Sequence, residues 1–442
     1  MTGRASNTET DGLSRALEAQ RERLLPCVHC GFCLAACPTY NRLGDENDSP
    51  RGRLDLMAAV VDGRLPATSE AFRTHIDRCL GCRACEPVCP SGVEYGALLE
   101  LARDVATDAV PPALPTRLLL AAFQGGGIQS LFFFGGRLLR GSGLAWLGAR
   151  VLPAAGLLRG AKLGLAMLAS SRAWGRLRTV GGAAGTFADR ETEPVVRRGR
   201  VALLTGCVQE GLYDRVNAAS VRVLEANGYE VVDVPAQGCC GALHAHGGAL
   251  EDARGLARTN VGAFGASEAD WIVVNAAGCG AAMKEYGELL GEDSARGVAS
   301  KVRDLAELLA AGDIRRGSPV PCTVAVDHPC HLIHAQGIEQ EPITVLESVP
   351  GVEVRVVERA DECCGGAGIY GITHPELGGR IGGDKVAAVK RCGADVLATP
   401  NPGCMMQIGA GLLMDGSHIG VIHPVEILDE SYRRAGFYGG AG

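Results

Sequence analysis

Residues 27–38 read CVHCGFCLAACP, and residues 79–90 read CLGCRACEPVCP. Both stretches follow the pattern Cys-x2-Cys-x2-Cys-x3-Cys-Pro. In such a run the first three thiolates hold one iron–sulfur cube, and the fourth, which precedes a proline, belongs to the other cube. The repeated pattern therefore predicts two [4Fe-4S] clusters with crossed ligands. We expect the first cluster on Cys27, Cys30, Cys33 and Cys89, and the second on Cys79, Cys82, Cys85 and Cys37.

Zinc and disulfide bonds are the alternatives for these eight cysteines. Structural zinc sites prefer Cys-x2-Cys pairs that are set well apart, and a disulfide framework needs an oxidising compartment. The first 25 residues are polar and charged, without the apolar region of a secretion signal. With 18 cysteines in the chain, this favours a reducing cytoplasm and iron–sulfur ligation.

The spacer between the two runs is expected to be helical. Ser49-Pro50 has the composition of a helix N-cap followed by proline at the first helical position, and the helix should stop at Gly63. This favours an all-helical ferredoxin domain over the small β-rich type. The nearby arginines either offset the negative charge of the clusters or are ordinary solvated side chains. They are Arg51, Arg53, Arg78 and Arg83.

An acid-free segment follows the ferredoxin region. Residues 109–188 contain no Asp or Glu but nine Lys and Arg, in a chain whose net charge is −7. The segment is apolar and rich in glycine, so nucleic acid is not an expected partner, and its Gly-rich breaks disfavour a membrane-spanning helix. Three interpretations remain open: helices on the surface of the inner membrane, a surface for a partner protein, or a linker packed on its own protein.

The remainder of the chain contains an internal duplication. Cys207 precedes Cys330 by 123 residues, the pair Cys239-Cys240 precedes Cys363-Cys364 by 124, and Cys279 precedes Cys404 by 125. Short apolar stretches alternate with helical patterns in both copies, which predicts parallel α/β units. The expected strands are 201–205, 229–234 and 271–274 in the first copy, and 324–327, 352–357 and 396–399 in the second.

Each special cysteine of the two copies follows an expected strand, where α/β folds place their sites. The sequence thus predicts a multidomain α plus α/β protein, with an all-helical ferredoxin domain and a duplicated cysteine-rich α/β domain. The expected units are 1–110, the connecting segment 111–195, and the two copies 196–316 and 317–442.

The spacing of a cysteine, then Cys-Cys-Gly, then another cysteine resembles the cysteine-rich CCG domain of heterodisulfide reductases. Behind a two-cluster ferredoxin domain, the order resembles the iron–sulfur subunits of glycolate oxidases. The full CCG pattern ends in Cys-x2-Cys, but Ala276 and Asn401 occupy the first of those positions here. The resemblance leaves a further cluster, a zinc ion or a purely structural role open for the CCG cysteines. These are Cys207, Cys239, Cys240, Cys279, Cys330, Cys363, Cys364 and Cys404.

The resemblance implies an electron-transfer subunit of a flavin-dependent 2-hydroxy-acid dehydrogenase, most directly one that converts glycolate to glyoxylate. Neither a P-loop nor a dinucleotide-binding glycine motif occurs in the chain, so no flavin is expected on it. The FAD would lie on partner subunits, and a quinone or another acceptor would receive the electrons. One alternative is a catalytic reductase whose CCG halves act on a disulfide or a quinone, but the missing thiolates at 276 and 401 favour electron transfer. The other alternative that the resemblance implies is the equivalent subunit of a lactate or glycerol-3-phosphate dehydrogenase.

Overall fold

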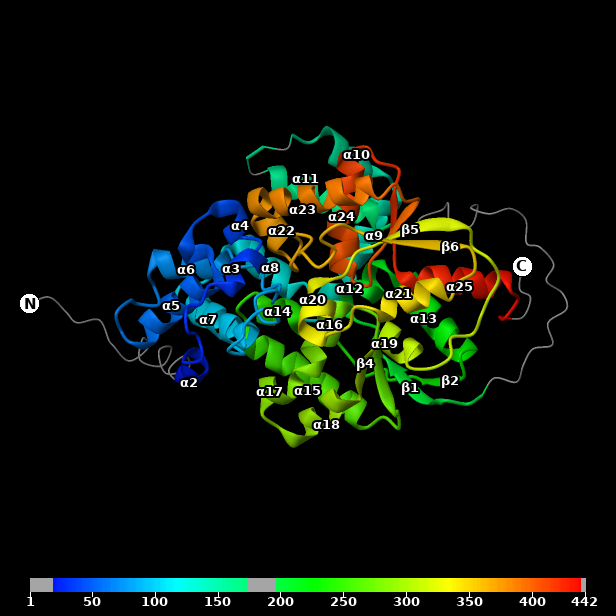
Figure 1. Cartoon of the computed structure of the whole chain (residues 1–442), viewed down its shortest axis with the longest axis horizontal. Helices are drawn as coiled ribbons and strands as arrows, with labels where there is room; N and C mark the ends of the chain where they lie inside the picture. Colours follow the sequence, from blue (N-terminus) through cyan, green and yellow to red (C-terminus); the bar gives the residue numbers. More distant parts are fainter. Residues whose placement is uncertain (1–18, 154, 157, 174–195, 439–442) are drawn as a thin grey trace, which may run out of the picture.

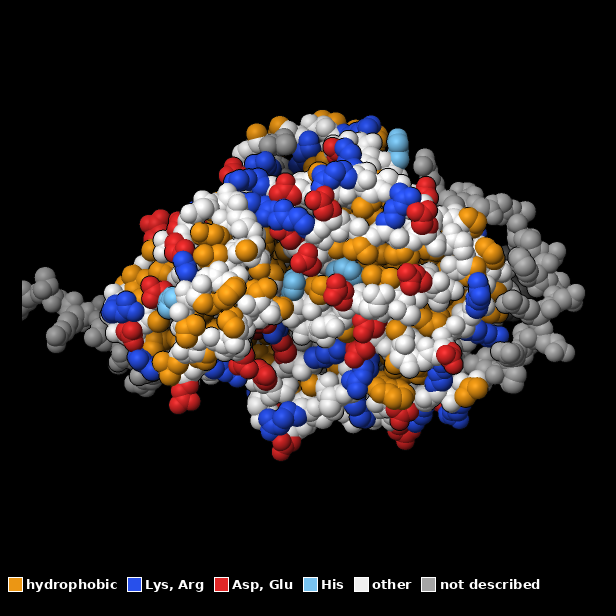
Figure 2. All heavy atoms as spheres, viewed as in Figure 1, with side chains coloured by type: hydrophobic (Ala, Val, Ile, Leu, Met, Phe, Trp, Pro, Cys, Tyr) orange, Lys and Arg blue, Asp and Glu red, His pale blue; other side chains and the backbone are white. Residues whose placement is uncertain are grey.

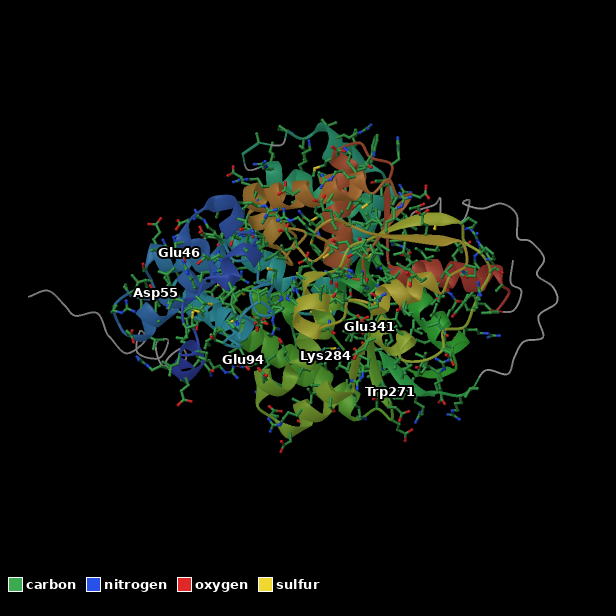
Figure 3. All side chains as sticks on the ribbon, in the orientation of Figure 1. Glu46, Asp55, Glu94, Trp271, Lys284 and Glu341 are labelled. Atoms are coloured by element: carbon green, nitrogen blue, oxygen red, sulfur yellow. The ribbon has the colours of Figure 1, made fainter. Side chains whose placement is uncertain are left out.

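The computed structural model describes residues 19–153, 155–156, 158–173 and 196–438. The ferredoxin region lies at one end of the molecule (Figure 1), where Glu46, Asp55 and Glu94 are labelled in Figure 3. No strand occurs in described residues 19–110, so the prediction of an all-helical domain is confirmed. Its helices are α2 (Arg21–Leu24), α3 (Phe32–Ala36), α4 (Tyr40–Leu43), the 3-10 helix η1 (Glu46–Asp48), α5 (Pro50–Val61), α6 (Glu70–Asp77) and α7 (Tyr95–Ala109).

Helix α5 begins as the sequence predicts. The Ser49 hydroxyl accepts a hydrogen bond from the Gly52 amide at 3.0 Å, and Pro50 is the first helical residue. An N-cap of this kind satisfies one of the amides that the first turn leaves unpaired. The apolar face of α5 then enters the ferredoxin core, where Met57 is fully buried.

The acid-free segment forms a layer of helices over the rest of the protein. Its helices are α8 (Leu114–Ala121), α9 (Gly126–Gly141), α10 (Leu144–Val151) and α11 (Leu158–Ser170). Phe133 of α9 lies on Gly211, where an added Cβ would come within 2.4 Å of the aromatic ring. Glycine at 211 therefore allows the close approach of α9. Residues 174–195, including Arg176 and Arg178, lie outside the described residues.

The outer side of this layer exposes many large apolar side chains. No single helix in the described part of the chain has the length and hydropathy to cross a membrane, and α8 with α9 passes that test only as a pair bent by 102°. Described residues 109–173 contain no acidic side chain. The exposed apolar residues of α9 and α10 are Ile128, Leu131, Phe132, Phe134, Leu138, Leu144, Trp146, Leu147 and Val151.

Each cysteine-rich copy contains a four-stranded parallel sheet, in the order β2-β1-β3-β4 and β6-β5-β7-β8. The strands of the first copy are β1 (Gly199–Leu203), β2 (Tyr229–Val232), β3 (Trp271–Val274) and β4 (Val302–Asp304). Those of the second are β5 (Cys322–Val326), β6 (Val352–Val356), β7 (Val396–Ala398) and β8 (Gly420–Ile422). The predicted parallel α/β fold of both copies is thus confirmed, and Figure 3 labels Trp271 on β3.

Helices separate the strands in both copies. The first copy contains α12 (Cys207–Leu212), α13 (Asp214–Ala226), α14 (Ala242–His246), α15 (Leu250–Gly265), α16 (Ala277–Lys284), α17 (Tyr286–Leu290), α18 (Asp293–Lys301) and α19 (Leu305–Ala310). The second contains α20 (Cys330–Gln336), α21 (Glu341–Glu347), α22 (Tyr370–Thr373), α23 (Pro375–Arg391), α24 (Pro402–Met414) and α25 (Pro424–Arg434).

The outer strands β4 and β8 were not predicted from the sequence. Each has only three residues, and so short a stretch carries too little periodicity to be recognised. They complete the sheet edge beside β3 and β7.

The two copies share one hydrophobic core. Val201 of β1 and Val324 of β5 belong to the same cluster of buried side chains. Helices α13 and α25 lie between the two sheets (Figure 1), and the Asn227 side chain donates a hydrogen bond to the Tyr432 hydroxyl at 3.1 Å. The duplication therefore produces two sheets that pack as one body.

Candidate redox site

The eight cysteines of the repeated run line two neighbouring hollows in the ferredoxin region. Cys27, Cys30, Cys33 and Cys89 line the first hollow together with Arg51. The second hollow is lined by Cys37, Cys79 and Cys82 with Arg53, and Cys85 lines both hollows. The last cysteine of each run thus lies at the hollow of the other run. All 18 cysteines are free thiols.

One thiol of the second hollow, Cys79, is favoured in its ionised form. Although burial opposes ionisation, the nearby Arg53 and Arg103 lower the pKa of Cys79. The Cys79 sulfur also accepts hydrogen bonds from the Gly81 amide at 3.4 Å and from the Tyr95 hydroxyl at 3.5 Å. Thiolates are the ligands of iron–sulfur clusters, so these residues fit a cluster.

A buried network of ion pairs and hydrogen bonds lies next to this hollow. Asp48 is fully buried, and its Oδ1 lies 3.2 Å from Arg53 Nη2 and 3.0 Å from His75 Nδ1. Arg53 also donates to the Thr39 hydroxyl at 3.1 Å, and Thr39 lies 3.2 Å from the Cys37 sulfur. The buried Arg53 is therefore a structural and electrostatic part of the site, whereas Arg78 is 40% exposed and pairs with Asp48 at the edge.

Each CCG copy gathers its four cysteines at the carboxyl ends of its strands. In the first copy, the sulfur atoms of Cys207 and Cys239 are 3.5 Å apart. In the second, those of Cys364 and Cys404 are 3.3 Å apart. Seven of these eight thiols are buried, and Cys279 is partly buried. The strand-end positions expected from the sequence are thus where the structure places them.

Among the described residues, no three CCG thiols gather as closely as the ligands of one zinc ion. Four sulfurs at about 2.3 Å from zinc would all lie within about 4 Å of one another. Among the described residues, only Asp45, Asp48 and His75 form a group of three such donors within 4.8 Å of each other. The carboxylate of Asp48 is already engaged by Arg53, so that group is an ion-pair network.

The two positions that depart from the full CCG pattern have different surroundings. Ala276 is buried next to α16 and contributes no ligand atom. Asn401 donates from Nδ2 to the Cys404 sulfur at 3.3 Å, and its Oδ1 accepts from the Gly278 amide of the other copy at 3.3 Å. Asn401 therefore links the two copies at the place where the pattern would have a fifth thiolate.

Both sets of CCG cysteines open onto one cavity of about 490 Å³ between the copies. All eight of these cysteines line it, and α9 and α11 supply the opposite wall. The sequence places each set in its own copy but contains no sign that they face each other.

The ferredoxin region contacts the second CCG set directly. Cys82 belongs to the same cluster of buried side chains as Cys330 and Cys363. Burial, and then the neighbouring Cys330 thiol, raise the pKa of Cys82 well above its ordinary value. The Tyr370 hydroxyl fixes this contact by donating to the Arg78 carbonyl at 2.8 Å. The second hollow and the second CCG set are therefore neighbours.

A buried ion pair distinguishes the second copy from the first. Lys385 Nζ lies 2.8 Å from Asp327 Oδ1, and both side chains are at most 4% exposed. The matching positions of the first copy hold Leu204, at the end of β1, and Asn260, in α15, and both are buried. The charge beside the two cysteine sets is therefore different, which the cysteine spacing does not reveal.

Comparison with protein-family models agrees with this architecture. A 4Fe-4S dicluster domain matches residues 23–93, and the cysteine-rich CCG domain matches residues 201–284 and 324–409. These features define an iron–sulfur protein in which a two-cluster ferredoxin domain is joined to a pair of CCG domains.

The sequences of two known proteins align with nearly the whole chain. The chain is 35% identical to the probable glycolate oxidase iron–sulfur subunit of Bacillus subtilis, over 92% of this chain and 94% of that protein. It is 33% identical to the glycolate oxidase iron–sulfur subunit of Escherichia coli, over 95% and 97%. The chain belongs to the family of glycolate oxidase iron–sulfur subunits. A fumarate reductase (CoM/CoB) subunit of Methanothermobacter marburgensis is 34% identical over 53% of this chain and 46% of that protein.

Proposed function

We propose that this chain is the electron-transfer subunit of a flavin-dependent 2-hydroxy-acid dehydrogenase, most directly one that oxidises glycolate to glyoxylate. The FAD lies on partner subunits, and a quinone receives the electrons. The observation that carries the proposal is the buried cluster that Cys82 shares with Cys330 and Cys363, because it places a predicted ferredoxin ligand beside a CCG set. When bound, each [4Fe-4S] cluster accepts and passes on one electron.

The first hollow is the proposed contact for the flavin subunit. Cys30 at its rim is exposed. Large apolar side chains surround it, and hydrophobic groups gather on this end of the molecule (Figure 2). Exposed apolar side chains next to a redox site suit a stable protein contact. These residues are Leu25, Val28, Phe32 and Val88.

A test of this function uses the native complex with its flavin subunits. Replacing Cys363 with alanine should leave the ferredoxin clusters reducible by glycolate but stop delivery of electrons to a quinone, because Cys363 packs with Cys82 and also lines the cavity. Freeze-quench electron paramagnetic resonance follows the clusters, and quinone absorbance follows delivery. Cys239→Ala is the parallel change in the first copy.

Cys392→Ala is the matched control, because this half-buried thiol lies outside both cysteine sets. It should leave both steps unchanged. A Cys363→Ala complex that assembles normally and reduces quinone at the wild-type rate would refute the electron path through the CCG domains. Wild-type ferredoxin clusters that stay oxidised with glycolate would refute the proposed substrate.

The acid-free layer is proposed to rest on the inner membrane, on its cytoplasmic face. It combines exposed apolar side chains with basic residues, and each basic residue near an anionic membrane contributes about 1 kcal/mol. We expect the complex to co-sediment with anionic liposomes at low ionic strength and to be released by salt. Leu131→Glu on the exposed face of α9 should weaken binding at least several-fold.

Met414→Glu is the control for this change, since Met414 is also exposed but lies on α24. It should bind liposomes as the wild type does. If the wild-type complex ignores anionic liposomes at low salt, the layer is instead a surface for a partner subunit or a packed linker.

A further inference from the structure

The cavity between the CCG copies has an apolar wall made by the acid-free layer. Phe123, Phe132 and Phe133 all line it and pack edge to face, with ring centroids 5.4 to 5.9 Å apart. Met167 and Leu168 of α11 extend this wall. Aromatic and aliphatic walls of this kind suit a flat, apolar ligand.

The cavity offers an anion no lysine or arginine. Among the described residues that line it, none is Asp, Glu, Lys or Arg. Its two histidines, His246 and His331, lie together with ring centroids 5.0 Å apart, and His246 is already paired with Glu100 at 3.0 Å. A carboxylate such as glycolate would lose its hydration against the aromatic wall without gaining a permanent cationic partner, which is strongly unfavourable. The wall therefore favours an uncharged ligand over a 2-hydroxy acid or a charged disulfide.

One buried polar side chain that lines the cavity, on α12, has an unused acceptor. Gln209 is 2% exposed, and its Nε2 donates to the Asn275 carbonyl at 3.0 Å and to the Asn275 Oδ1 at 3.1 Å. Both partners are acceptors, so the orientation of the amide is settled. Gln209 Oε1 has no partner among the described residues, although a buried unpaired acceptor costs about 1–3 kcal/mol. Oε1 is itself buried, so a ligand hydroxyl reaches it only when this side chain turns toward the cavity.

We propose that this cavity binds the head ring of a lipid-soluble quinone, which rests on the function proposed above. The ring would lie between the two sets of CCG cysteines, against the phenylalanines. Its tail would leave past Phe132, which lines the cavity and is also 45% exposed, onto the apolar outer face of α9.

The reduction of the bound ring balances with what the complex supplies. The quinone gains two electrons, supplied by the reduced flavin of the partner subunit, and two protons from water. The two carbonyl groups become hydroxyls as two O–H bonds form. An oxidised quinone has no hydrogen to donate, whereas the hydroquinone can donate one to Gln209 Oε1 once that side chain turns toward the ring. In that orientation Gln209 would favour the reduced product and raise the tendency of the bound ring to accept electrons.

A large side chain introduced at Gly164 would fill the cavity without disturbing the fold. This glycine of α11 lines the cavity, and an added Cβ would meet no atom within 4 Å. Gly164→Trp places an indole in the space proposed for the ring. Gly135→Trp is the matched control, since Gly135 lies in α9, also has open space at its Cβ and does not line the cavity.

The experiment uses the native complex and a short-chain azido-ubiquinone as the photoactivatable probe. We expect the label on peptides of α9, α11 or α12, and at least a tenfold loss of both labelling and quinone reduction in Gly164→Trp. The Gly135→Trp complex should keep both. A label that maps elsewhere in the wild type, or wild-type labelling in Gly164→Trp, would overturn the site.

Labelling requires no glycolate, so it tests the site separately from the proposed function. Ferredoxin clusters that glycolate fails to reduce would refute the function, while a correctly placed label would still support the cavity. Clusters that are reduced normally, together with a quinone that labels another surface, would refute the cavity alone.

Discussion

Replacing Cys89 with serine is expected to remove the cluster of the first run and to leave that of the second. Cys89 belongs to the second run in sequence, yet it lines the first hollow with Cys27, Cys30 and Cys33. Serine is a poor ligand for this iron, so the bound iron should fall from about eight to about four atoms per chain. Iron analysis and reduced-state electron paramagnetic resonance check this result.

Cys322→Ser is the control, because Cys322 is a buried thiol of β5 outside every predicted ligand set. It should keep both clusters. The reciprocal change Cys37→Ser should remove the cluster of the second run. If Cys89→Ser instead abolished the cluster of its own run, with Cys79, Cys82 and Cys85, the crossed assignment would be wrong.

Replacing Lys385 with methionine is expected to lower the free energy of unfolding of the paired CCG copies by about 3–5 kcal/mol. The change leaves the carboxylate of Asp327 buried without its partner, and the loss of one member of a buried pair typically has this cost. Lys385 also donates to the carbonyls of Arg359 and Ala360, which would lose a donor. Chemical denaturation followed by circular dichroism measures the effect.

The duplication supplies a matched variant for this prediction. The double change Asp327→Leu with Lys385→Asn copies Leu204 and Asn260 of the first copy. It should cost much less than Lys385→Met, because no charge remains unpaired. Arg391→Met is a surface control: its pair with Glu358 is exposed on both sides, and its loss should cost less than about 1 kcal/mol. Equal stability of Lys385→Met and Arg391→Met would contradict the argument.

Much of the fold could be predicted because its signals are local. The N-cap at Ser49 and the proline after it mark the start of α5, and three strands in each copy were recognisable as short apolar runs. The strands β4 and β8 were missed because three residues do not establish a period. Lys385 gave no such signal, because α23 carries several other charged residues and only burial in the fold sets this one apart.

The residues that carry the further proposal could not be recognised in this way. Gln209 follows Cys207 by two positions, and nothing in that spacing shows that its Oε1 is left without a partner. The sequence does not show whether Phe133 is buried or exposed, and only its contact with Gly211 in the folded protein settles this. These roles depend on which distant segments meet.

The sequence alone determines the ligand chemistry, the duplication and the alternation of strands and helices. Each of these can be recognised from residue types and from their spacing along the chain. Three features arise only on folding. The two cysteine sets line one cavity, Cys82 lies near Cys330, and α9 and α11 cover the cavity. They result from packing between segments that are far apart in sequence. Burial of apolar surface determines which of these segments pack together, and no local sequence pattern predicts that pairing.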